Sequence, residues 1–239
     1  AGKINLSLYN ALEAADISSD LVILSTRDHG LPKRIYPVIF DFNYVIVTIK
    51  IDGESYFLDA TDGFLPFGQV PFRALNGEGR IINFKKESNW VSLKPKYKSS
   101  KNISAKLSLN EDGDFEGNLL IKRHGYTAQK QRKKFYKLGE EKYLEEFEEY
   151  NPNIEIDEYK ISYLDEIEHP LKEVFKVNIL MDDESGAQKI RINPFFFDRL
   201  QENPFKLKER NYPVNFGHSK KLNFVLSLKI PESYTVTQL

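Results

Sequence analysis

A carboxyl group and a phenol are brought together by the spacing of one predicted β-hairpin. Residues 43–51 alternate as in a strand, Asp52-Gly53 is the pair that best predicts a two-residue hairpin turn, and residues 54–59 return. In that register Tyr44 and Asp59 share one face as diagonal neighbours. A carboxylate at such a position can orient a catalytic base. Tyrosine has a reference pKa of about 10, so Tyr44 is a poor base at neutral pH.

A second group of reactive side chains lies in the predicted loop Thr26–Pro32. It contains Arg27, Asp28 and His29, which could line a binding cleft. The simpler interpretation is a loop held by salt bridges, because short motifs of this kind are weak evidence.

An enzyme built from these residues needs a nucleophile and a base. Ser7, Ser25, Thr26 and Tyr44 are the candidate nucleophiles, with His29 as the base, but none lies in a recognisable nucleophile elbow. The other histidines, at positions 124, 169 and 218, have no metal-ligand spacing. We therefore predict no metal site and no cofactor.

The hairpin and the run Leu58-Asp59-Ala60-Thr61 resemble the core of the transglutaminase-like superfamily, within the papain-like cysteine proteases. The resemblance implies a Cys-His-Asp triad, with Asp59 at the Asp position and Tyr44 at the His position. The cysteine position falls at or next to Ala1, and the chain contains no cysteine. Two of the three catalytic positions thus depart from the pattern. The resemblance therefore implies the fold and argues against the reaction.

Further strings extend the resemblance over nearly the whole chain. Leu65–Gly68 and Leu75–Arg80 are similar to segments of bacterial relatives, and Gly125, Tyr126, Ala128 and Arg132 belong to a string of the second half. Asn203-Pro204-Phe205, Arg210–Val214 and Ile230–Tyr234 follow in the same order. This half resembles a β-sandwich domain of unknown function that follows the transglutaminase-like core in bacterial envelope proteins. The resemblance implies a location in the bacterial cell envelope or periplasm.

Composition limits the classes of function. The chain has 239 residues, of which 41% are hydrophobic and 29% charged, as in globular proteins. Its 34 basic residues nearly balance 35 acidic ones, so we predict no nucleic-acid partner. No apolar run reaches transmembrane length, so we predict no membrane insertion within the chain. The chain does not begin with Met, and we expect a fragment or a processed product.

The predicted fold class is α+β. Residues 1–94 form an N-terminally truncated transglutaminase-like core, in which a helix over residues 4–15 packs on an antiparallel sheet through an apolar stripe that includes Ile4 and Leu6. Residues 95–102 form a linker. Residues 103–239 form an antiparallel β-sandwich with a helical insertion at 126–150, divided at Gly139, and with a strand at 188–193.

These observations predict a non-catalytic, degenerate module that binds a peptide or glycan, or serves as a scaffold, through Tyr44, Asp59, Arg27, Asp28 and His29. Two alternatives remain open. One is a residual hydrolase or acyl transferase that uses residues other than cysteine. The other is a protein-interaction module that uses the aromatic cluster Phe195–Phe197 of the second domain. For the non-catalytic module we expect Asp59 to be either partly solvated or held by donors, which are the Tyr44 hydroxyl or backbone N–H groups of residues 60–62.

Overall fold

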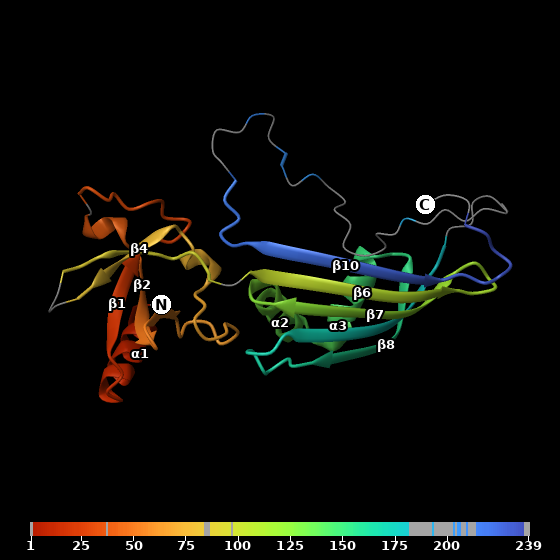
Figure 1. The fold of residues 1–239 in the computed structure, drawn as a ribbon, viewed down its shortest axis with the longest axis horizontal. Coiled ribbons are helices and arrows are strands. Elements are labelled where there is room, and N and C mark those ends of the chain that lie inside the picture. Colours follow the sequence, from red (N-terminus) through yellow and green to blue (C-terminus); the bar gives the residue numbers. More distant parts are fainter. Residues whose placement is uncertain are drawn as a thin grey trace. The chain divides into compact units, whose positions relative to one another are not determined.

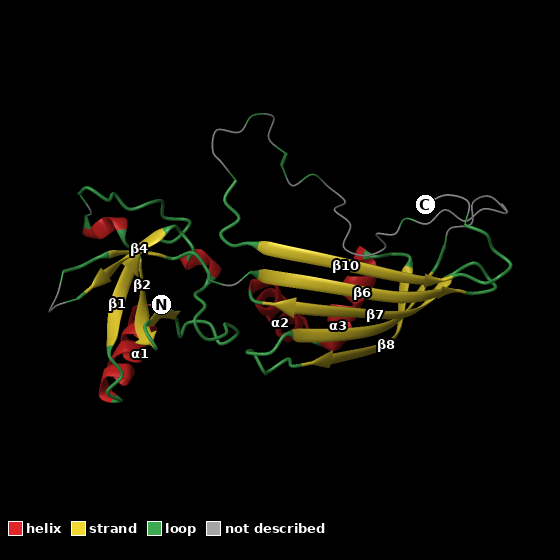
Figure 2. Ribbon diagram, in the orientation of Figure 1, coloured by secondary structure: helices red, strands yellow, loops and turns green. Residues whose placement is uncertain are grey.

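The computed structural model describes residues 2–36, 38–83, 87–96, 98–181 and 214–236, together with residues 193, 203, 205, 206 and 209. The chain divides into two compact units, which are described separately. Unit 1 comprises Ala1–Ser99 and Phe216–Lys220, and unit 2 comprises Ser100–Asn215 and Lys221–Leu239. Figures 1 and 2 show that both units combine a sheet with helices, as expected for an α+β fold.

Unit 1 is an antiparallel sheet with one helix packed against it. Its elements are α1 (Gly2–Ala14), β1 (Ser19–Leu24), the 3-10 turn η1 (Ile39–Asp41), β2 (Tyr44–Ile51), β3 (Glu54–Leu58), the 3-10 turn η2 (Phe72–Ala74), β4 (Glu78–Ile82) and β5 (Trp90–Ser92). The strand order is β3-β2-β1-β4-β5. Helix α1 contacts β1 and β2, so it covers the strands that lead into the hairpin.

The β2–β3 hairpin has the predicted register. Ile51 pairs with Glu54 and Val47 with Leu58. Both turn residues, Asp52 and Gly53, have positive φ angles, of 51° and 81°, which is the conformation that a type I′ turn requires. The return strand ends at Leu58, one residue earlier than predicted, so Asp59 begins the turn that follows.

The predicted apolar stripe of α1 is wrong at two positions. Ile4 is 49% exposed and Leu6 is 43% exposed, whereas Asn5 is fully buried. Hydrophobic periodicity alone does not identify a polar residue such as Asn5 as buried. The asparagine is buried because β2 and the turn after β3 offer partners for its amide, as described below.

Unit 2 is a five-stranded sheet that carries two helices. Its elements are β6 (Ser99–Leu109), β7 (Phe115–His124), α2 (Tyr126–Leu138), α3 (Glu140–Tyr150), β8 (Ile154–Ser162), β9 (Leu171–Ile179) and β10 (Lys220–Lys229). The strand order is β10-β6-β7-β9-β8, and the sheet curls along its strands (Figure 1). Gly139, at φ 78°, divides the two helices as predicted.

The β-sandwich stays a prediction, because the described part of unit 2 contains one sheet covered by helices and the second sheet of a sandwich is not among its described residues. The predicted linker 95–102 needs correction, because β6 begins at Ser99. Of the predicted strand at 188–193 the structure describes only residue 193, and the aromatic cluster Phe195–Phe197 lies outside the described residues.

One face of the unit 2 sheet forms its core. Alternate residues of β6, from Ile103 to Leu109, pack with those of β7 and β9, and Leu144 and Phe147 of α3 pack against this cluster. Strands with one apolar and one polar face follow the alternation of a half-covered antiparallel sheet. The opposite face of the sheet is polar and does not belong to this core.

Arg132 attaches α2 to the loop between β8 and β9. Its side chain is 1% exposed, and its guanidinium donates hydrogen bonds to five backbone carbonyl groups over 2.8–3.4 Å. The acceptors are the carbonyls of Tyr163, Leu164, Glu166, Ile167 and His169. A planar group with five donors is suited to such a cage of carbonyls.

We predict that Arg132→Met lowers the free energy of unfolding by about 3 kcal/mol, because buried carbonyl groups then lose their donors. Urea unfolding followed by circular dichroism measures the change. Lys130→Met is the matched control, since Lys130 is exposed on the same helix, and it should change stability by less than about 0.5 kcal/mol. Equal stability of the two variants would contradict the structural role of Arg132.

Candidate functional site

Tyr44 and Asp59 meet on one face of the hairpin. Tyr44, the first residue of β2, is 8% exposed, and its hydroxyl donates a hydrogen bond of 2.8 Å to Oδ2 of Asp59. This contact confirms the predicted hydrogen bond between the two side chains. It depends on the hairpin register, because a shift of one residue would place the two side chains on opposite faces.

The Asp59 carboxylate accepts three further hydrogen bonds. The amide of Asn5 donates to Oδ2 over 3.1 Å. Thr61 donates to Oδ1 twice, from its backbone N–H over 2.8 Å and from its hydroxyl over 2.5 Å. Both predicted kinds of donor, the Tyr44 hydroxyl and a backbone N–H of the following turn, are therefore used together. Four donors to one carboxylate offset the cost of removing it from water.

Asn5 joins α1 to both strands of the hairpin. Its Nδ2 donates to the carbonyl of Val45 over 2.8 Å as well as to Asp59, and its Oδ1 accepts from the backbone N–H of Ala60 over 2.9 Å. The side chain is fully buried with these partners. The sequence analysis missed this residue. A polar residue in the middle of an otherwise amphipathic helix was the available signal.

Arg73 of η2 adds a positive charge to the cluster. Its Nη2 donates to the Tyr44 hydroxyl over 2.7 Å and to the Thr61 hydroxyl over 2.6 Å. The guanidinium also lies 5.0 Å from the centre of the Tyr44 ring, within range of a cation–π interaction. Arg73 is exposed, and it was not predicted because no local pattern relates it to Tyr44.

Every hydroxyl of this cluster has several partners. Each hydroxyl, of Tyr44 and of Thr61, accepts a hydrogen bond from Nη2 of Arg73 and can donate to Asp59, and the two hydroxyl oxygens lie 3.0 Å apart, where either can be the donor. The two hydroxyl groups thus connect a carboxylate to a guanidinium. The arrangement is a closed hydrogen-bond network in which neither hydroxyl has a second proton to give.

The electrostatics keep Tyr44 in its neutral form. Burial raises the pKa of the Tyr44 hydroxyl, and the hydrogen bond and negative charge of Asp59 act in the same direction. The hydrogen bonds from Thr61 and Arg73 oppose this change only in part. At neutral pH the group is a phenol and a donor, so it lacks the basicity of the histidine that the resemblance places there.

The predicted loop residues are held by hydrogen bonds. Arg27 donates from Nη1 to the carbonyl of Leu75 over 2.9 Å, and its guanidinium lies 4.6 Å from the centre of the Phe72 ring. Asp28 accepts from the hydroxyl of Thr26, a bond that lowers the pKa of the Asp28 carboxyl. His29 contacts the carbonyl of Phe40 through Nε2 at 2.9 Å. The contacts named here are hydrogen bonds and a cation–π contact, whereas the simpler interpretation expected salt bridges.

The loop touches the Tyr44 cluster through its backbone. The N–H of Arg27 donates to the carbonyl of Arg73 over 2.9 Å, and Asn43 exchanges hydrogen bonds with Thr26. The side chains of Asp28 and His29 use other partners, so the hydrogen bonds of the site do not bring the five predicted binding residues to one point. Arg73 is the residue that contacts both the Tyr44 cluster and the loop Thr26–Pro32.

Several requirements of catalysis can be compared with the structure. Ala1, the expected cysteine position, lies outside the described residues. Among the candidate nucleophiles, Ser25 is 1% exposed, and the Thr26 hydroxyl is bonded to Asp28 and Asn43. Within the described ranges, no three His, Cys, Asp or Glu side chains are grouped as metal ligands are.

Comparisons with known proteins concern the C-terminal segment. A family model described as a domain of unknown function with a solved structure (DUF3858) matches residues 188–239. No curated protein and no solved structure matches the chain. Strand β10 lies in the matched segment. Separately, none of the helices in the described residues has the length and apolarity needed to cross a membrane.

We predict that Tyr44→Phe lowers the free energy of unfolding by about 1–3 kcal/mol, because Asp59 loses a donor and Arg73 an acceptor. Urea unfolding measures this change. Tyr36→Phe is the matched control, since Tyr36 is 81% exposed, and it should leave the denaturant midpoint unchanged. The same midpoint for Tyr44→Phe and wild type would show that the network contributes little to stability.

The pH dependence of the same pair gives a second prediction. In the unfolded chain Tyr44 titrates at about pH 10, and its folded pKa is higher. Its contribution to stability is therefore fully present below about pH 10 and is lost as the pH rises toward the folded pKa. The stability difference between wild type and Tyr44→Phe should shrink between about pH 8 and about pH 11. A difference that stays constant or grows would contradict the raised pKa.

Proposed function

We propose that the chain is a non-catalytic, transglutaminase-like module of a bacterial envelope protein that binds a peptide or glycan or acts as a scaffold. The observation that carries this proposal is the closed network of Tyr44, Asp59, Thr61 and Arg73. In the triad that the resemblance implies, the aspartate would orient a histidine. Here Asp59 accepts hydrogen bonds from groups that other contacts already hold in place, so the Asp59 carboxylate stabilises the fold.

Cysteine-dependent acyl transfer needs a thiolate and a base that activates it. The chain has no cysteine, and Tyr44 is a buried phenol with a raised pKa. Loss of one member of such a catalytic unit already removes most of the rate, so the phenol at the base position and the lack of cysteine in this chain both support the non-catalytic proposal. The lack of cysteine supports the proposal only for this reaction class.

Two features support the finer assignment of fold. Helix α1 contacts β2 and bonds through Asn5 to Asp59, which is the relation between core helix and hairpin that the resemblance implies. The match of residues 188–239 to a domain of unknown function agrees with the expected order, in which such a domain follows the core. The β-sandwich and the envelope location are proposed on that resemblance.

A binding or scaffolding role is supported by exposed groups of unit 1. Apolar side chains between 71% and 86% exposed gather in one loop, and they are Leu31, Ile35, Tyr36, Ile39 and Phe40. Large apolar side chains grouped on a surface are typical of interaction sites. Arg73, anchored through Nη2, is also exposed, and its guanidinium can receive a carbonyl or carboxylate of a peptide.

The test is turnover. Incubation with a glutamine-containing peptide and a fluorescent amine should give no amide hydrolysis and no amine transfer above the buffer rate. Turnover that Asp59→Ala abolishes would overturn the non-catalytic assignment. Turnover that persists in Asp59→Ala and disappears in His29→Gln would instead support a hydrolase that uses residues other than cysteine. Circular dichroism of each variant controls for loss of the fold.

A further inference from the structure

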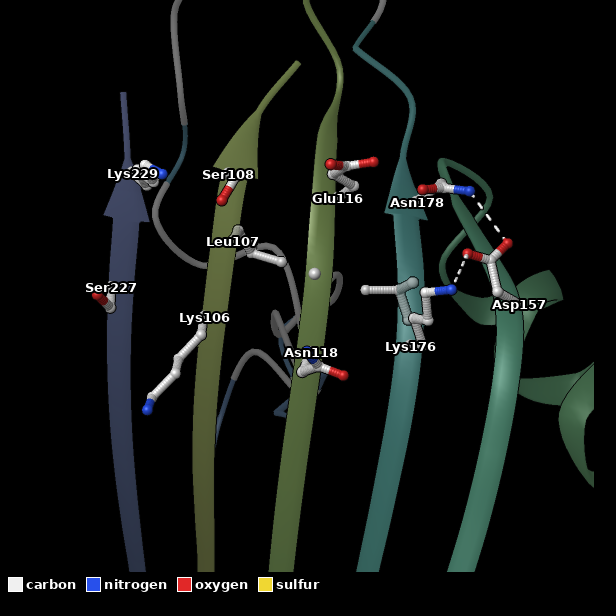
Figure 3. A pocket seen from close by; sticks show the side chains of 12 residues that line it. Lys106, Leu107, Ser108, Glu116, Asn118, Asp157, Lys176, Asn178, Ser227 and Lys229 are labelled. Carbon is white, nitrogen blue, oxygen red and sulfur yellow. Dashed lines mark hydrogen bonds and ion pairs between the residues drawn. The ribbon is translucent and has the colours of Figure 1, made fainter. Parts of the chain in front are cut away.

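The polar face of the unit 2 sheet contains a hollow of about 520 Å³ (Figure 3). Strands β10, β6, β7, β9 and β8 all contribute residues to its lining. The volume lies within the range of roughly 300–1,000 Å³ that is usual for small-molecule sites. The hollow is remote in sequence from Tyr44 and Asp59, and neither residue lines it.

The backbone of Gly117 lies at the floor of the hollow. It lies on β7 between Glu116 and Asn118, and it pairs with Leu107 and Val177, which point to the core. Its φ angle is 155°, and a Cβ atom built there would lie 2.1 Å from the carbonyl oxygen of Lys106. A side chain is therefore excluded at this position. Because Leu107 and Val177 point to the core, backbone forms the floor between the two polar rows.

Two rows of polar side chains border this floor. Lys106, Asn118 and Lys176 are paired across three strands, and Ser108, Glu116 and Asn178 form the next polar row. Figure 3 shows Glu116 and Asn118 on either side of the floor, with Lys106 and Lys176 on the flanking strands. Donors and acceptors of hydrogen bonds thus alternate around a surface without a side chain of its own.

The two sides of the hollow differ in how their side chains are bonded. At β8 and β9, Lys176 pairs with Glu158 at 3.3 Å and Asp157 at 3.9 Å, and Asn178 donates to Asp157 over 3.1 Å. Within the described part of the chain, the side chains of Lys106, Ser108, Glu116 and Asn118 have no such partner. Glu116 is therefore an open acceptor, and Lys106 and Asn118 are open donors.

We propose that this hollow binds a glycan. An anion is disfavoured by Glu116 and a cation by Lys106, whereas different hydroxyl groups of a sugar can donate to the carboxylate and accept from the ammonium. A sugar ring can lie across the backbone floor at Gly117, with its hydroxyl groups directed to the two polar rows. The inference rests on the proposed binding role of the chain and names its ligand class. It does not depend on the catalytic state of the Tyr44 site.

The test is a titration of the full chain with diacetylchitobiose, cellobiose and maltose, and separately with inorganic phosphate, followed by NMR shifts of the side-chain amides. We expect at least one disaccharide to shift the Asn118 amide. Glu116→Gln should weaken that binding about tenfold, since it removes a charged acceptor. Asn118→Ala should weaken it about fivefold.

Glu145→Gln is the matched control, because Glu145 is exposed on α3 and makes the same change of charge, and it should leave binding within about twofold. Failure of all three sugars to bind would overturn the inference. So would binding of phosphate alone that Glu116→Gln strengthens, because the hollow would then be an anion site. These readouts are separate from peptide turnover, so failure here leaves the non-catalytic assignment standing.

Discussion

The partly buried carboxylate of Asp59 is the constraint on which unit 1 depends. A carboxylate withdrawn from water without partners costs several kcal/mol, so the fold must bring donors to it. Four hydrogen bonds do so, and they come from α1 through Asn5, from β2 through Tyr44 and from the turn after β3 through Thr61. The requirement of one side chain therefore fixes the position of a helix against a hairpin. Arg73 balances the charge through two hydroxyl groups.

Unit 2 meets a similar constraint more deeply in its core. Glu173 is fully buried on β9 and pairs with Arg123 of β7, while Tyr143 of α3 and Tyr159 of β8 both donate to Oε1 of Glu173. Burial raises the pKa of both tyrosines, so they remain neutral donors. As in unit 1, tyrosine hydroxyls complete the shell of a carboxylate. The donors come from β7, α3 and β8. The network therefore holds α3 against the sheet and also compensates the buried charge of Glu173.

Contacts within one hairpin could be predicted from the sequence, whereas contacts set by tertiary packing could not. The Asp52-Gly53 turn fixes a register, and that register places Tyr44 beside Asp59 without further information. Arg73 lies 29 residues from Tyr44 and joins it only because η2 folds back over the hairpin. Asn5 was missed because hydrophobic periodicity does not show which polar side chains will find partners inside the fold.

The polar cluster around Asp59 and the polar cluster around Gly117 differ in one property that decides their use. Around Asp59, each hydroxyl proton is already donated within the protein, so a ligand would have to replace an existing hydrogen bond. Around Gly117, the acceptor of Glu116 and the donors of Lys106 and Asn118 face solvent, and a ligand would replace water only. Exchange of water for ligand hydroxyls costs little, whereas opening a satisfied buried network costs the full desolvation of its groups. This difference distinguishes a site that stabilises the fold from a site that can bind a ligand.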